Sequence, residues 1–85
     1  MRHARDEDLD RVEPLLAQIR ACPVLKEKKR GVFYRRGRAF LHFHEDPKGL
    51  FADIRNATDG EFERIDVTLA AGRAELIRAA RQRVA

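Results

Sequence analysis

The fold is decided by residues 38–55, which read RAFLHFHEDPKGLFADIR. Apolar and polar residues alternate on both sides of the central DPKG, as in two half-buried strands joined by a tight turn. A turn centred on Pro47-Lys48 pairs His42 with Asp53 and Leu41 with Ile54. The stretch therefore predicts an antiparallel hairpin with one apolar face and one face that carries histidine and aspartate.

A second hairpin is predicted on the N-terminal side of this one. Arg36-Gly37 fits a two-residue turn, because glycine readily supplies the positive φ that such turns need. Counting from this turn places Phe33 opposite Phe40 and Val32 opposite Leu41. The predicted core face then carries Val32, Tyr34, Ala39, Leu41, Phe43, Leu50, Ala52 and Ile54. The other face, which we call the mixed face, would carry Phe33, Arg35, Arg38, Phe40, His42, His44, Phe51, Asp53 and Arg55.

Helical periodicity flanks the hairpins. Apolar residues spaced by three and four predict an amphipathic helix over 6–20 and a closing helix over 69–84. If the first helix starts at Asp10, Pro14 lies harmlessly in its first turn; a start at Asp6 predicts a kink there. Residues 24–27 and 62–67 are candidate outer strands. The order α-β-β-β-β-α predicts an α+β, two-layer sandwich, in which an antiparallel sheet of three or four strands packs under an N-terminal and a C-terminal helix.

Length and composition narrow the class of protein. Eighty-five residues, 44% hydrophobic and 38% charged, predict a single globular domain over 1–85. No apolar run approaches the roughly 18 residues of a membrane span, and the N-terminus lacks a signal-peptide core, so a cytoplasmic protein without a membrane partner is expected. Cys22 is the only cysteine, which precludes an intrachain disulfide. The absence of serine excludes a Ser-His-Asp triad, and no nucleotide-binding motif or cofactor is expected.

Positive charge is concentrated in residues 23–38, which carry seven lysines and arginines against one glutamate. These cations could follow a phosphate backbone while Phe33, Phe40 and Phe51 stack on bases. In the alternative, the segment is an edge strand protected from aggregation by its lysines, and the phenylalanines are buried in a homodimer. The candidate nucleic-acid-binding residues are Lys26, Lys28, Lys29, Arg30, Arg35, Arg36 and Arg38.

A second candidate site lies on the hairpin. His42 and His44 are two apart on a strand and point the same way, and Asp53 is opposite His42, so the three could form a His₂-carboxylate site for a metal or small ligand. The simpler alternative is a polar sheet face with cross-strand pairing. His3 is expected in a frayed terminus, and Cys22 is expected to be a half-buried structural thiol.

Part of the chain resembles a known family. The run from Leu16 to Pro23, followed by residues 24–28 and by VFYRRGRAF at 32–40, looks like the opening of the MmcQ/YjbR-like family, whose hairpin has the form F-x-x-x-G-K-x-F-A. The likeness covers about residues 12–55 and stops before the family's longer C-terminal half. Arg38 stands where the family usually has lysine. The resemblance implies a compact α+β fold and DNA binding, and carries over no catalytic residue.

A second similarity concerns residues 40–46, FLHFHED, which resemble the F-x-H-x-H-x-D strand of small luciferase-like domains. Taken together, the sequence predicts a small cytoplasmic binding protein that uses its basic first hairpin for nucleic acid. The alternative is a metal- or small-ligand-binding module, conceivably an enzyme, built on His42, His44 and Asp53. Non-catalytic binding is favoured over catalysis.

Overall fold

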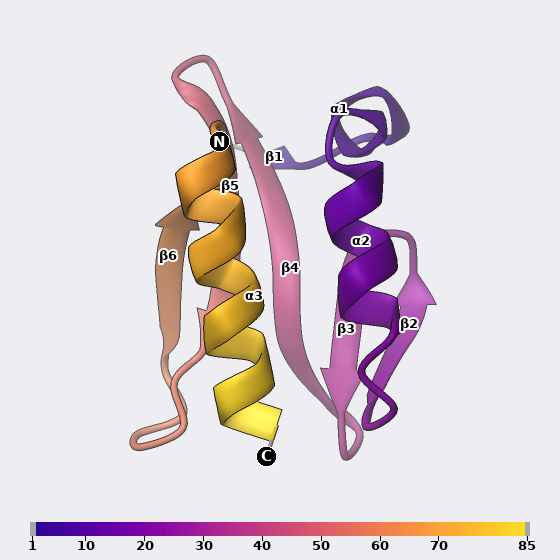
Figure 1. The fold of residues 1–85 in the computed structure, drawn as a ribbon, viewed down its shortest axis with the longest axis vertical. Coiled ribbons are helices and arrows are strands. Elements are labelled where there is room, and N and C mark those ends of the chain that lie inside the picture. Colours follow the sequence, from indigo (N-terminus) through magenta and orange to yellow (C-terminus); the bar gives the residue numbers. More distant parts are fainter. Residues whose placement is uncertain (1, 85) are drawn as a thin grey trace.

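The computed structural model of the protein describes residues 2–84. One short strand and two helices precede five consecutive strands, and a third helix follows them (Figure 1). The helices are α1 (Asp6–Asp10), α2 (Glu13–Arg20) and α3 (Ala70–Val84). The strands are β1 (Arg2–His3), β2 (Leu25–Lys29), β3 (Val32–Arg35), β4 (Arg38–Asp46), β5 (Gly49–Arg55) and β6 (Phe62–Asp66).

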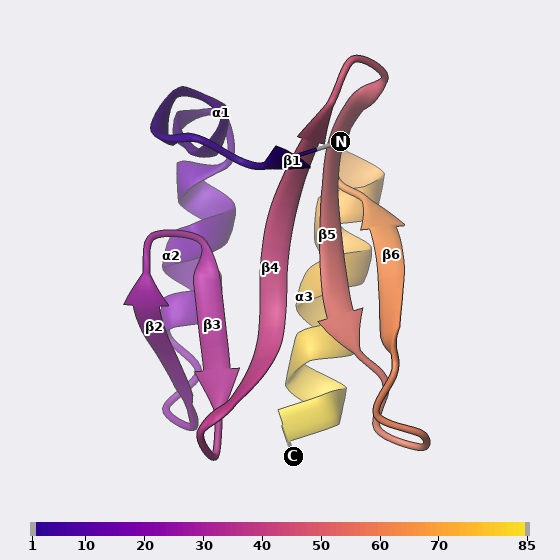
Figure 2. The ribbon, with the colours of Figure 1, turned by 180° about the vertical axis from the view of Figure 1, so that it is seen from behind.

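One antiparallel sheet holds all the strands, in the order β2-β3-β4-β5-β6, and β1 pairs with β4 beyond the end of β3. The helices α2 and α3 cover one face of the sheet, and Figure 2 shows the opposite face free of helices. The predicted α+β class is therefore confirmed, with helices towards both ends of the chain. The expectation of three or four strands was too low, because β1 was expected to be frayed and β2 was uncertain.

The N-terminal helical region is divided. Helix α1 ends at Asp10, and α2 begins at Glu13 with Pro14 inside its first turn. A proline is tolerated there because the first backbone N–H groups of a helix have no acceptor within the helix. The predicted single helix over 6–20 is thus two short helices, and Pro14 lies in the first turn of the second one rather than kinking a long one.

The hairpin β4–β5 has the predicted register. His42 pairs with Asp53 and Leu41 pairs with Ile54. The alternation of apolar and polar residues and the position of the turn specify the same pairing. A shift by one residue would move every apolar side chain out of the core.

The hairpin β3–β4 departs from the predicted register. Tyr34 pairs with Ala39 as expected, but Phe33 pairs with Leu41 instead of Phe40. Phe40 is the extra residue of a β-bulge, which shifts the rest of the pairing by one. Val32 consequently lies opposite His42 instead of Leu41.

Because of this bulge, the residues that the sequence placed on the mixed face do not all lie there. Phe33 and Phe40 are 0% and 4% exposed and belong to the hydrophobic core. Phe51 alone of the three phenylalanines stays partly exposed, opposite His44. The predicted dimer surface made by Phe33, Phe40 and Phe51 together is therefore wrong.

The core lies between the sheet and the two longer helices. Its largest fully buried side chains are Phe33, Leu16, Ile19, Leu41, Ile54, Leu76, Val12 and Val67. Every helix within residues 2–84 is too short or too polar to cross a bilayer.

Candidate metal centre

Three histidines meet on the sheet face that the helices leave uncovered. His3 in β1 lies directly opposite His44 in β4, and His42 lies two residues before His44 on the same side of that strand. One ring nitrogen from each residue lies within 4.8 Å of those of the other two. The chain contains three histidines, so the cluster gathers all of them.

The short strand β1 brings His3 to this position. The Ala4 amide donates to the Phe43 carbonyl at 3.0 Å, and Arg2 pairs with Glu45 both in strand register and through an ion pair of 3.0 Å. The His3 and His44 rings stack with centroids 4.9 Å apart. A two-residue strand is too short to show a periodic pattern, which is why His3 was expected in a frayed terminus.

The pKa values of the two β4 histidines favour the neutral, metal-binding form. Burial lowers the pKa of His42, and the charge that His44 can carry lowers it further. Burial likewise lowers the pKa of His44, although the Asp53 carboxylate opposes this. A neutral imidazole has a free lone pair for a metal, whereas an imidazolium ion has none.

The ring nitrogens of these two residues are poorly satisfied. Within residues 2–84, Nδ1 of His42 and both ring nitrogens of His44 are buried without a hydrogen-bond partner. Nε2 of His44 does lie 3.1 Å from Oδ2 of Asp53, but the angles there do not make a hydrogen bond. Unsatisfied buried polar atoms cost about 1–3 kcal/mol each, so a ligand that used these lone pairs would be stabilising.

Asp53 lies beside the histidines but is already paired. Its carboxylate accepts from Arg64 in a two-pronged ion pair, with distances of 2.9 and 3.2 Å. Burial alone would raise the pKa of Asp53, but the Arg64 hydrogen bond and charge outweigh it, and the pKa is lowered. The structure thus brings His42, His44 and Asp53 together as the sequence suggested, but it offers His3 as the third unpaired ligand.

An aromatic side chain shields the cluster from the direction of β6. The Phe62 ring lies 4.8 Å from the His42 ring, edge to face, and the Arg55 guanidinium lies 4.4 Å above Phe62. The His44 side chain is only 15% exposed. The enclosure explains why burial is the leading influence on both pKa values.

The predicted nucleic-acid-binding residues are distributed over the edge strand β2, the bend that follows it and the β3–β4 turn. Arg30 is held by ion pairs to Asp6, Asp10 and Glu13. Lys26, Lys28 and Lys29 are exposed along the edge strand β2, while Arg35, Arg36 and Arg38 surround the β3–β4 turn. Because Phe33 and Phe40 are buried, they are not available to stack on bases.

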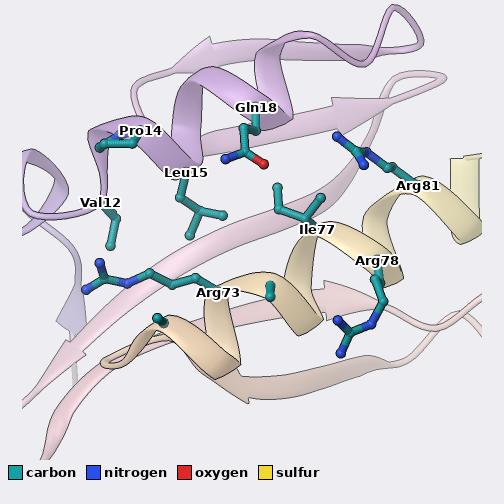
Figure 3. A pocket seen from close by; sticks show the side chains of 10 residues that line it. Val12, Pro14, Leu15, Gln18, Arg73, Ile77, Arg78 and Arg81 are labelled. Carbon is teal, nitrogen blue, oxygen red and sulfur yellow. The ribbon is translucent and has the colours of Figure 1, made fainter.

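A groove of about 440 Å³ lies between α2 and α3 (Figure 3). Leu15 and Ile77 face one another across it, and Arg73 and Arg81 lie near its two ends. Arg73 donates to the carbonyls of Val67 and Thr68. The ten lining residues of the groove include no histidine, thiol, hydroxyl or carboxylate.

No protein-family model, curated protein or solved structure matches this chain. Inference about function therefore depends on the geometry of the histidine cluster.

Proposed function

We propose that this protein binds one divalent transition-metal ion, zinc in the first instance, through His3, His42 and His44. The observation that carries the proposal is the approach of three imidazole nitrogens to within 4.8 Å of one another. Zn–N bonds of about 2.0–2.1 Å in a tetrahedron separate the ligand nitrogens by about 3.3 Å. Side-chain rotations that bring the nitrogens closer by about 1.5 Å would complete the site, without a change in the sheet.

The ligand set indicates which metals would bind. Imidazole suits zinc, copper and nickel, whereas magnesium and calcium prefer oxygen ligands. A structural zinc site usually has four protein ligands, whereas three leave a coordination position open to water or a small anion. Zinc at such a site lowers the pKa of its bound water to about 7, so the centre could supply hydroxide.

Asp53 and Arg64 would orient the histidine ligands without themselves binding the metal. A carboxylate that is close to a metal-bound imidazole can accept its second N–H and fix the ring. Asp53 lies 3.1 Å from Nε2 of His44, and Arg64 holds the carboxylate in place. In this role Asp53 orients a ligand and does not itself bind the metal.

Metal binding is favoured over the nucleic-acid function predicted from the sequence. Two of the three proposed stacking residues are in the core, and Arg30 is neutralised by three carboxylates. Nucleic-acid binding by the remaining cations, the resemblance to the MmcQ/YjbR-like family and a homodimer stay predictions.

The direct test is titration of metal-free, untagged protein with Co²⁺, followed by visible absorption, and then displacement by Zn²⁺. A His-tag must be absent, because it would bind the same metals. We expect one ion per chain with a Kd of about 1 µM or below. His3→Ala, His42→Ala and His44→Ala should each weaken binding by at least about 100-fold, since loss of a supporting residue alone costs 10–100-fold.

Cys22→Ala serves as the matched control, because Cys22 is the one thiol of the chain and lies outside the cluster. Its Kd should equal that of the unaltered protein. Binding no tighter than about 100 µM, or binding that survives the loss of all three histidines, would remove the proposal.

A further inference from the structure

A second cluster of positive charge lies at the end of the sheet that holds both the β3–β4 turn and the β5–β6 loop (Figure 2). Two hollows there, of about 350 and 170 Å³, share Arg35, Arg38, Phe40 and Arg55 in their linings. None of these residues belongs to the histidine cluster.

Like charges are held together at this turn. Arg35 lies directly opposite Arg38, and Arg36 stands between them at the tip. Like charges directly opposed across two strands destabilise a sheet. The turn is also restrained, because Arg36 and Gly37 both have the positive φ values, 53° and 80°, of a tight two-residue hairpin.

Within residues 2–84, no carboxylate forms an ion pair with any of these three arginines. Seven other arginines of the described residues do form ion pairs, whereas Arg55, Arg73, Arg78 and Arg81 form none. Arg20 is paired with Glu13 and Glu27, and Arg30 is paired with three acids. The one acidic residue that lines the hollows is Asp59, and its carboxylate accepts the Glu61 amide at 3.0 Å.

The walls of the larger hollow, of about 350 Å³, are fixed by other hydrogen bonds. Arg55 donates to the carbonyls of Ala39 and Gly60, which ties β5 to the start of β4 and to the loop. Arg38 reaches across to this loop, since a Cβ built on Gly60 would lie 4.0 Å from its Nη2 atom. The guanidinium groups of Arg35 and Arg38 thus border a hollow whose far wall is already rigid.

We infer that this hollow binds a phosphomonoester group through Arg35 and Arg38, with Arg36 adding charge at the rim. The planar guanidinium fork matches phosphate oxygens in paired hydrogen bonds, and a dianion would relieve the repulsion between the opposed arginines. The hollow is large enough to take the phosphate and part of the group attached to it. A small phosphorylated molecule and the 5′-phosphate of a nucleic-acid strand offer the same chemistry.

The test uses the full chain in phosphate-free, low-salt buffer. Inorganic phosphate, adenosine 5′-monophosphate, and one short oligonucleotide with and without a 5′-phosphate are titrated, with ¹H–¹⁵N spectra and calorimetry as readouts. We expect saturable binding of the mononucleotide, with shifts concentrated in residues 35–39 and 55–60. Arg38→Gln should weaken binding about tenfold or more.

Arg78→Gln is the matched control, because Arg78 is exposed on α3 and lines neither hollow, and its loss changes the net charge equally. It should alter the Kd by less than about twofold.

A second measurement distinguishes a binding role of Arg38 from a structural one. Without phosphate, Arg38→Gln should keep or raise the urea midpoint, because it removes a repulsion. Arg35→Gln should behave the same way and provides an independent variant.

Three results would overturn the inference. One is no saturable shift at up to about 10 mM phosphate or mononucleotide, which is far weaker than charge-assisted recognition gives. Another is equal weakening by Arg78→Gln and Arg38→Gln, which would indicate general charge attraction. The third is oligonucleotide binding that is indifferent to the 5′-phosphate and tighter than mononucleotide binding, which would assign the turn to the nucleic-acid backbone. Tighter binding of the mononucleotide would identify a small phosphorylated molecule as the ligand, and preference for the 5′-phosphorylated strand would identify the strand end.

Discussion

His42 and His44 occupy the uncovered face of the sheet, yet both are half-buried. Phe62 and the neighbouring imidazoles provide the enclosure. Burial leads the influences that lower both pKa values below the ordinary value of 6.5. Both imidazoles are therefore uncharged at neutral pH, and each has one ring nitrogen whose lone pair can bind a metal.

These pKa values predict how stability depends on pH in the metal-free protein. Because the folded chain holds protons on these histidines less tightly than the unfolded chain, the unfolded chain gains protons first as the pH falls below 6.5. The contribution of the two uncharged histidines to the free energy of unfolding is complete above about pH 7. It is lost progressively as the pH falls below 6.5. The urea midpoint, followed by circular dichroism, should therefore be lower at pH 5 than at pH 7.5.

The double substitution His42→Gln and His44→Gln should flatten this dependence. Between pH 5 and 7.5 the carboxyl groups interfere little, since Glu13, Glu27 and Asp53 have pKa values lowered from ordinary values of 4.5, 4.5 and 3.8. The stability that these three carboxylates contribute is present at pH values above their ordinary pKa values and is lost at lower pH. A midpoint that stays level or rises towards pH 5 in the unaltered protein would contradict the assignment.

Asp53→Asn tests whether the carboxylate supports the ligands. The change keeps the size of the side chain but removes the charge that Arg64 holds and that lies 3.1 Å from His44. We expect the zinc Kd to rise about 10–100-fold, measured by competition with a chelating dye. Glu63→Gln removes the same charge from the neighbouring strand β6, where Glu63 pairs with Arg83, and should leave the Kd within about twofold. Equal Kd values for Asp53→Asn and the unaltered protein would rule out a supporting role.

Among the elements, β1 decides whether the cluster has three histidines or two. It consists of two residues, held by backbone pairing to β4 and by the ion pair between Arg2 and Glu45. Glu45→Lys would place like charges opposite each other and loosen β1. Metal affinity should then fall towards that of His3→Ala, whereas the urea midpoint should change little, because exposed ion pairs contribute only about 0–1 kcal/mol.

Glu61→Lys is the comparison variant for this experiment, since it changes the charge equally in the exposed β5–β6 loop. It should bind cobalt as the unaltered protein does. If Glu45→Lys also binds normally, β1 does not control the site.

Helix α3 packs closely on the end of β6 through Gly72. A Cβ built on this glycine would lie 1.7 Å from the Asp66 carbonyl oxygen, which is backbone and cannot rotate away. Gly72→Ala should therefore destabilise the fold by about 1–3 kcal/mol, as overpacking does, even though alanine favours helix by about 1 kcal/mol. Ala74→Gly, at an exposed position of α3, should cost about 1 kcal/mol. A higher urea midpoint for Gly72→Ala would mean that the close approach is absent in solution.

The elements also show how far sequence reasoning extends. The β4–β5 register was predictable because strand alternation and the turn at residues 46–49 specify the same pairing. The β3–β4 register was not, because a bulge at Phe40 changes the count while leaving the sequence pattern almost unaltered. The adjacent apolar residues Phe40 and Leu41 were the available signal, since two neighbouring side chains of a regular strand cannot both enter one core.

The candidate site, too, was only partly predictable from the sequence. The H-x-H pattern with Asp53 across the hairpin placed His42 and His44 on one face, as the structure has them. His3 could not be assigned, because it is brought to the cluster by two backbone pairs and one ion pair with a strand 40 residues away. The pairing of Asp53 with Arg64 likewise depends on β6, whose register the sequence did not specify.

At the scale of the whole molecule, the core and the histidine cluster lie on opposite faces of the sheet, since Leu41 and Phe43 alternate with His42 and His44 along β4. The fold should therefore form without metal, unlike a zinc finger, which is unfolded in its absence. Zinc at 100 times its Kd should add about 2.7 kcal/mol to the free energy of unfolding and raise the Tm by about 10 °C or more. A chelator should return the Tm to the metal-free value and leave the far-ultraviolet circular dichroism unchanged. Loss of that signal on chelation would show instead that the metal holds the core together.

X-ray absorption spectroscopy at the zinc edge, on the untagged protein loaded with one equivalent of zinc, tests the three-histidine centre most directly. The expected result is four ligands at about 2.0–2.1 Å, of which three show the multiple scattering of imidazole and one is a water or hydroxide oxygen. His3→Ala should lower the imidazole count to two. A sulfur ligand at about 2.3 Å, which only Cys22 or the thioether of Met1 could supply, or fewer than three imidazoles in the unaltered protein, would contradict the assignment of the site.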